Sequence, residues 1–228
     1  MFKNMLDFWK GKDFLTNVLG EFGEMLDDSK KMFDDVCQNL LENKKIDGLE
    51  DKIYSVDKRI NLFEKDIRKR IIAHLSIQPS VDVPMSLLMM SVVKDAERLG
   101  DYAKNIFQVG RVINRPIDKN VFSKYFNEID KKIMQMFDDT KTAFIDSDEE
   151  KARQIWKTER LIVKRCDAIV VDVAKSSLTV DQAVAFALIA RYFKRIVAHL
   201  TNIATSVILP ISELDFFDES RRSEDDKA

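Results

Sequence analysis

This chain of 228 residues contains only two cysteines, four prolines, six glycines and two histidines. The two cysteines, Cys37 and Cys166, lack the spacing of a metal-ligand pair and suit a reduced, intracellular compartment. So little glycine and proline leaves little room for turn-rich β structure. No secretory leader and no run near the ~20 apolar residues of a membrane span is present. We therefore expect a soluble, cytoplasmic protein.

An excess of charge of one sign is also absent, because 37 basic residues face 39 acidic ones and the net charge is −2. No overall electrostatic field therefore favours nucleic acid or an anionic membrane, and we expect no nucleic-acid partner. The chain has no Ser-His-Asp set, no P-loop and no dinucleotide-binding turn. The sequence therefore predicts none of these three kinds of catalytic or nucleotide-binding site.

Long amphipathic helices account for most of what is present. Apolar residues recur with the 3.6-residue period of a helical face in six segments, and turn residues such as Asp47-Gly48, Arg115-Pro116 and Pro210 separate them. The first four segments span about 14–43, 49–75, 84–114 and 119–145. The fifth follows the cap Asp146-Ser147-Asp148 and ends near Lys175, and the sixth spans about 181–209. The predicted fold class is all-α.

The second three segments repeat the pattern of the first three. Matching residues stand 97 positions apart in the third and sixth segments, namely Arg98 and Arg195, Asn105 and Asn202, and Ile106 and Ile203. A similar match, offset by 102 positions, relates the second and fifth segments. The repetition predicts two tandem three-helix bundles packed side by side, since each bundle alone would leave an apolar stripe uncovered.

The repeat also divides the chain. We expect an aromatic N-terminal arm at 1–15, a first repeat at 16–116, a second repeat at 117–211 and an acidic, disordered tail at 212–228. The arm is expected to pack on the bundle, with a dimer contact or a membrane-surface anchor as alternatives. A homodimer is therefore one expectation for the assembly.

Two acids one helical turn apart are the most distinctive polar feature of the third segment. Glu97 and Asp101 stand four residues apart, where like charges weaken a helix by about 0.2–0.5 kcal/mol. They lie opposite the apolar face, so we expect both at the bundle surface. With oxygens from Asp57, Asn61 or Glu64 of the second segment, they would suit Mg²⁺, Mn²⁺ or iron as a weak metal site.

Ion pairing is the alternative for the same acids, because Lys94 and Arg98 stand beside them and exposed ion pairs are common. Both interpretations remain open at this point. The second half has lost the acids, since Lys194 and Ala198 stand where the first half has Glu97 and Asp101. We therefore expect at most one half to bind metal, with Lys194 neutralising Glu159 in the other.

The remaining polar and reactive residues are expected to be structural. Arg98, Asn105, Arg195 and Asn202 occur in both halves, which favours a scaffold role in bracing helices and capping loops. We expect Cys166 to be a small buried hydrophobe, His199 to be a surface histidine, and the run Leu88-Met89-Met90 to fill the core.

Two motifs resemble the signature of PhoU domains. One is Glu97-Arg98-Leu99-Gly100-Asp101 followed by Asn105-Ile106, and the other is Asp57-x-x-Ile60-Asn61-x-x-Glu64-x-x-Ile67 on the preceding helix, with Gln78-Pro79 in the joining turn. The resemblance extends from about residue 15 to residue 215, and the second half matches the signature less well.

The resemblance implies an all-α protein of two three-helix bundles that regulates phosphate uptake and phosphate signalling without catalysis. It implies a phosphate transporter component or a sensor kinase as partner, with the membrane reached only through that partner. It also implies that some relatives bind metal ions through acidic motifs on the bundle surface. A helical adaptor unrelated to phosphate remains the alternative function. A metal-dependent enzyme is a third and less favoured function, because surface carboxylates lack the cavity that an active site needs.

Overall fold

The computed structural model of the chain describes residues 13–77 and 82–214. Seven α-helices, one short 3-10 helix and no β-strand lie in these two ranges, which confirms the all-α prediction. The elements are α2 (Asp13–Leu40), α3 (Leu49–Ile77), α4 (Val83–Val109), α5 (Lys119–Phe126), α6 (Ile129–Asp146), α7 (Glu149–Ala174), α8 (Val180–Thr205) and η1 (Ile211–Glu213). Almost all of the predicted arm and tail lies outside the described residues, and the domain boundaries remain a prediction.

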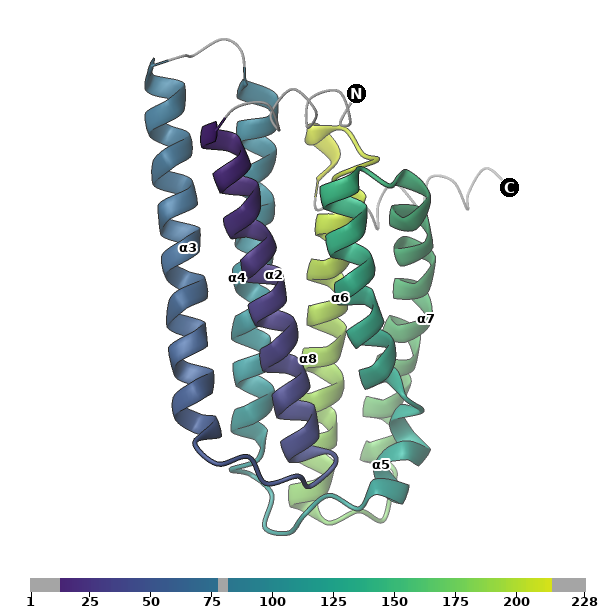
Figure 1. Cartoon of the computed structure of the whole chain (residues 1–228). Helices are drawn as coiled ribbons and strands as arrows, with labels where there is room; N and C mark the ends of the chain where they lie inside the picture. Colours follow the sequence, from purple (N-terminus) through teal and green to yellow (C-terminus); the bar gives the residue numbers. More distant parts are fainter. Residues whose placement is uncertain (1–12, 78–81, 215–228) are drawn as a thin grey trace, which may run out of the picture.

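The helices form two three-helix bundles placed side by side. Helices α2, α3 and α4 form the first bundle, and α6, α7 and α8 form the second, with the short α5 at one end (Figure 1). Helices α3 and α7 lie at the two outer edges, while α4 packs against α8 and α2 packs against α6 across the boundary. The predicted tandem arrangement is therefore confirmed.

One apolar core runs through both bundles. Phe33 of α2 lies with its ring centroid 5.8 Å from that of Phe137 on α6 and 5.5 Å from that of Phe193 on α8. All three rings are buried. Leu88 and Met89 are also buried and Met90 packs against the same core, so the run at 88–90 fills the core as predicted.

Local sequence signals set most helix boundaries. The carboxylate of Asp148 accepts a hydrogen bond from the backbone N–H of Lys151 at 2.9 Å, so the predicted cap of α7 is confirmed. Gly48 precedes α3 with a φ of +67°, a conformation that glycine adopts without strain. Helix α4 ends at Val109 rather than near residue 114, because Gly110 follows it and starts a turn.

The predicted helix at 119–145 is wrong in one respect, because it is two helices. Asn127 and Glu128 separate α5 from α6 with φ values of 45° and 60°, both left-handed. Asparagine tolerates this conformation better than most residues do. The break leaves α5 at the base of α8, where Phe122 and Phe126 stack at 4.2 Å and meet the edge of Phe186. Tertiary packing of aromatic rings therefore overrides the continuous helical pattern.

None of the helices within the described ranges is long and apolar enough to cross a lipid bilayer.

Both thiols are expected to be unreactive in the folded protein. Cys37 and Cys166 are buried and not bonded to each other, and burial raises the pKa of the Cys166 thiol to about 12, with the negative charge of Asp167 adding to the rise. The pKa of Cys37 is likewise raised well above its usual value by burial. Relative to an ordinary thiol, Cys166 should hold roughly a thousandfold less thiolate at neutral pH.

A thiol-reactive disulfide reagent should therefore label neither cysteine in native protein and both in concentrated urea. Rapid labelling of either cysteine in the native protein would contradict the burial of these thiols. The prediction that Cys166 behaves as a small buried hydrophobe is confirmed by its position in the core.

Candidate functional site

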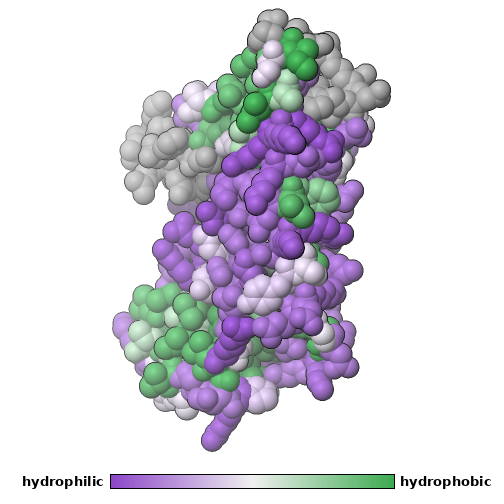
Figure 2. Space-filling view, turned by 90° about the vertical axis from the view of Figure 1, so that its left-hand side faces the viewer, coloured by the Kyte–Doolittle hydropathy of each residue, from purple (hydrophilic) through white to green (hydrophobic). Residues whose placement is uncertain are grey.

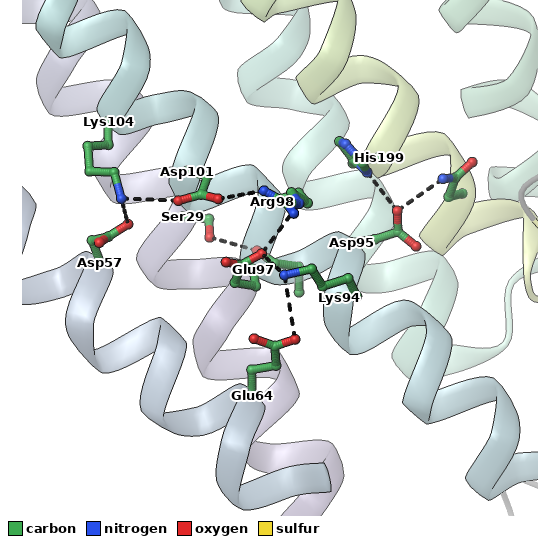
Figure 3. Close-up of polar contacts among 12 residues, drawn as sticks. Ser29, Asp57, Glu64, Lys94, Asp95, Glu97, Arg98, Asp101, Lys104 and His199 are labelled. Atoms are coloured by element: carbon green, nitrogen blue, oxygen red, sulfur yellow. Dashed lines mark hydrogen bonds and ion pairs between the residues drawn. The ribbon is translucent and has the colours of Figure 1, made fainter.

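The predicted metal-binding acids come together where α3 packs on α4. Asp57 and Glu64 extend from α3 toward Glu97 and Asp101 of α4 (Figure 3), and Asn61 lies half-buried on α3 between the two α3 acids. The expected exposure is wrong for Glu97, which is only 8% exposed, while Asp101 is half-buried. The reason is that α3 covers the polar side of α4, so this side is a second interface.

A glycine permits the two helices to come this close. A Cβ atom on Gly100 would lie 2.9 Å from Cδ1 of Ile60 on α3 and 3.7 Å from Oγ of Ser29 on α2. All three helices of the first bundle thus meet at this position, and only a residue without a side chain fits without movement of its neighbours. The Leu-Gly-Asp part of the sequence motif is therefore explained by packing.

Two lysines join the acids of α3 to those of α4. The Nζ atom of Lys104 donates to Asp57 at 2.7 Å and to Asp101 at 3.0 Å (Figure 3). The Nζ atom of Lys94 lies 2.8 Å from Glu97 and 3.8 Å from Glu64. Each ammonium group thus bridges one acid from each helix.

Two arginines also neutralise the negative charges of these acids. Arg98 donates to Asp101 at 2.9 Å and lies 3.7 Å from Glu97, and Arg68 lies 3.1 Å from Glu64. We call the whole set the α3–α4 charge cluster; its acids are Asp57, Glu64, Glu97 and Asp101, and its bases are Arg68, Lys94, Arg98 and Lys104. The four acids and four bases balance, so the cluster has no net charge.

Lys104 is the most tightly held base of this cluster. Burial by itself lowers the pKa of Lys104, but hydrogen bonds to Asp57 and Asp101 and their negative charges outweigh it, and the pKa is raised. The ammonium group therefore stays protonated at neutral pH between its two acids.

The contacts agree with the ion-pairing interpretation of the acids. Every carboxylate in the α3–α4 charge cluster already meets an ammonium or guanidinium group, so a metal ion would first have to displace Lys94 or Lys104. Among the residues that the structure describes, no three His, Cys, Asp or Glu side chains are grouped as a metal site. As arranged, the residues do not fit a bound cation, and metal binding remains a prediction without a contact to support it.

The second repeat lacks an equivalent cluster. Lys194 donates to both carboxylate oxygens of Asp167 at 2.7 Å, so it has a different acid from the predicted Glu159. Cys166 is buried beside this pair. The two repeats are therefore unlike at the positions that would bind metal, as the sequence suggested.

A second polar contact, which the sequence analysis missed, joins the two repeats. Asp95 of α4 is buried and accepts a hydrogen bond from Nδ2 of Asn202 at 3.0 Å, and it lies 2.7 Å from Nδ1 of His199 on α8 (Figure 3). The ring of Tyr102 stacks on His199 with centroids 5.5 Å apart. The surface position expected for His199 is therefore wrong, because the side chain is largely enclosed between the repeats.

A signal for Asp95 was present in the sequence. Every seventh residue of a helix lies on nearly the same side, and Asp95 is the acid in the row Leu88, Asp95, Tyr102, Val109. An acid among apolar and aromatic residues in such a row indicates a buried polar partner on the facing helix.

The other scaffold candidates differ in their contacts. Asn202 bridges the repeats, and Arg98 pairs within its own helix and does not brace a neighbouring one. Arg195 is exposed and Asn105 is half-buried, and neither side chain forms a hydrogen bond or ion pair to another described residue. Similar positions in the two repeats therefore serve different purposes.

Known proteins resemble the chain over both repeats. A curated relative, the phosphate-specific transport system accessory protein PhoU homolog of Clostridium acetobutylicum, is 23% identical over 205 residues, which cover 87% of this chain and 91% of the relative. A protein of the same name from Caulobacter vibrioides is 21% identical over 154 residues, or 65% of this chain and 67% of the relative.

Solved structures have the same fold. The crystal structure of PhoU from Pseudomonas aeruginosa superposes with a TM-score of 0.75 at 19% identity, covering 87% of this chain and 97% of that one. The phosphate transport system regulatory protein PhoU from Streptococcus pneumoniae gives 0.69 at 19% identity, covering 91% and 95%. The profile of the PhoU domain matches residues 22–109 and again residues 126–207. This chain therefore belongs to the PhoU domain family and carries two tandem PhoU repeats.

Proposed function

We propose that this protein regulates phosphate transport by binding a component of a phosphate transport system, without catalysing a reaction. The observation that carries the proposal is the match of both repeats to PhoU, together with relatives named as accessory proteins of phosphate-specific transport. Binding would take place on the cytoplasmic side of the membrane, through helix surfaces.

The structure offers helix surfaces rather than reactive groups for this role. The four acids of the α3–α4 charge cluster are bonded to lysine and arginine, and the thiols of Cys37 and Cys166 are buried, so neither set is free for chemistry. The long exposed faces of the helices, in contrast, are suited to recognition of another helical or flat protein surface. A sensor kinase is a second partner of the same kind within this proposal.

Deletion of the gene in its own host is expected to deregulate phosphate uptake when phosphate is plentiful. Uptake of labelled phosphate and expression of phosphate-starvation genes should both rise, and the wild-type gene supplied in trans should restore control. Crosslinking of the tagged protein in the same cells should recover a phosphate permease component or a sensor kinase.

Unchanged phosphate uptake in the deletion strain, with recovery of an unrelated membrane system, would instead support the adaptor function and overturn this proposal.

A Phe33→Ala variant is not a suitable loss-of-function control, because it should damage the whole fold. Leu161→Ala on the outer side of α7 should keep the fold, since this side chain is 71% exposed.

A further inference from the structure

One solvent-facing edge of the molecule combines lysine with isolated apolar residues. Along α3 these residues occur at successive helical spacings of three or four, which places them in one row on the side away from the core. We call this row the α3 ridge; it consists of Tyr54, Lys58, Leu62, Lys65, Lys69 and Ile72. Figure 1 shows α3 as the outermost helix of the first repeat, and Figure 2 looks onto this edge.

Among the described residues, no acid neutralises the lysines of the α3 ridge. Within residues 13–77 and 82–214, Lys58, Lys65 and Lys69 are exposed and form no ion pair. The acids of the same stretch of α3 are bonded elsewhere: Asp57 to Lys104, and Glu64 and Asp66 to arginines. A chain with a net charge of −2 thus presents a local row of three uncompensated positive charges.

The apolar residues of the ridge are spaced too widely for a partner helix. Leu62 is 55% exposed and Ile72 is 60% exposed, and ten positions separate them. A helix that docks in a groove needs apolar anchors at spacings of three, four and seven, which form a continuous stripe. Here lysines stand between the apolar residues, and Figure 2 shows this edge as mainly hydrophilic with separate apolar patches.

Lysine and isolated apolar side chains in one row suit the boundary of an anionic lipid bilayer. Lysine can extend its apolar stem along such a boundary and place its ammonium at lipid phosphates, while single leucine or isoleucine side chains enter the outer acyl region. The 29 residues of α3 give a nearly straight edge of about 43 Å, and a straight edge at the outside of the molecule can meet a plane along its length.

We propose that the α3 ridge binds directly to the anionic headgroups of a membrane surface. This contact goes beyond the proposed function, in which a transport protein alone holds the chain at the membrane. It would orient the first repeat toward the bilayer, with the axis of α3 parallel to the membrane plane.

The second repeat does not offer the same row. At the matching positions of α7, Arg160 stands for Lys58 and Lys164 for Leu62, but Asp167 replaces Lys65 and Val171 replaces Lys69. Asp167 is bonded to Lys194, so the continuous row of lysines is interrupted. Lipid contact would therefore involve one edge only, and α7 would face away from the membrane. The protein would bind in a single orientation, which leaves the second repeat accessible to a protein partner.

The test is cosedimentation of the full chain with vesicles of phosphatidylcholine, with and without phosphatidylglycerol. Wild-type protein is expected to bind only the vesicles that contain phosphatidylglycerol, and to dissociate as salt is raised. Each lysine near an anionic surface contributes about fivefold to binding, so a Lys58→Glu, Lys65→Glu, Lys69→Glu variant should lose at least roughly a hundredfold. Leu62→Ser with Ile72→Ser should weaken binding to a smaller extent.

A matched variant distinguishes the effect of the α3 ridge on binding from the effect of net charge. Lys157→Glu, Lys164→Glu and Lys175→Glu change three exposed lysines elsewhere and alter the net charge by the same amount, so this variant should still bind. Thermal melts of both variants would check that each is folded. The lipid assignment would be overturned if both variants lost binding equally, or if wild-type protein did not bind at low salt. It would also be overturned if wild-type protein bound an acidic peptide but not the vesicles. None of these results depends on phosphate transport, so the proposed function is tested separately.

Discussion

Replacing Phe33 with alanine is expected to lower the free energy of unfolding by about 3–5 kcal/mol, the usual cost of removing a buried phenylalanine ring. Phe33 belongs to the first repeat, yet its two ring neighbours, Phe137 and Phe193, belong to the second. The cavity would thus lie between the repeats and weaken the interface that makes them one unit. In a chain of 228 residues this cost corresponds to roughly 6–20 °C in melting temperature.

Thermal and urea unfolding followed by circular dichroism would measure this loss. Leu161→Ala is the control, because it also shortens an apolar side chain to alanine, but at an exposed position, and should change stability by less than about 0.5 kcal/mol. If Phe33→Ala unfolds in two separate transitions, the repeats are independently stable. If it melts like wild type, the aromatic contacts across the boundary contribute little.

The fold could be predicted from the sequence because its signals are local and repeated. Helix period, capping residues and the 97-residue offset each depend on neighbouring positions or on comparison of the chain with itself. The break between α5 and α6 could not be predicted in this way. The left-handed Asn127 and Glu128 are accommodated by the packing of Phe122 and Phe126 against Phe186 of α8, which is a contact between distant parts of the chain.

The sequence predicted which acids belong to the candidate site, but not that α3 buries Glu97. A helical wheel separates the polar side of α4 from its apolar side, but it does not show which other helix covers the polar side. Glu97 is buried because α3 supplies Glu64 on the same side and Lys94 lies between the two acids. A neutral set of charges can be buried at an interface where a lone acid cannot. The pairing partners, and not the acids alone, therefore decide where this part of the sequence lies.

The second large effect is expected from removing both bridging lysines. Lys94→Met together with Lys104→Met would leave the four acids of the α3–α4 charge cluster facing only two arginines. Removing one partner of a fully buried ion pair costs about 3–5 kcal/mol, and partial exposure of these groups reduces it to about 2–4 kcal/mol for the double variant. Urea unfolding measures the loss, and Lys94→Arg with Lys104→Arg is the control that keeps both charges.

The same variant tests whether the acids can hold a metal ion. With the lysines removed, Mn²⁺ no longer has to displace an internal cation, so saturating Mn²⁺ should restore about 2–3 kcal/mol of the lost stability. Wild-type protein should gain much less, because Lys94 and Lys104 already occupy the positions between the carboxylates. Equal stabilisation of wild type would show that metal binds without competition from the lysines, and no rescue of the variant would exclude these acids as ligands. In the arrangement seen here, Lys94 and Lys104 lie between the carboxylates, where a bound cation would have to lie, and their positive charges join α3 to α4.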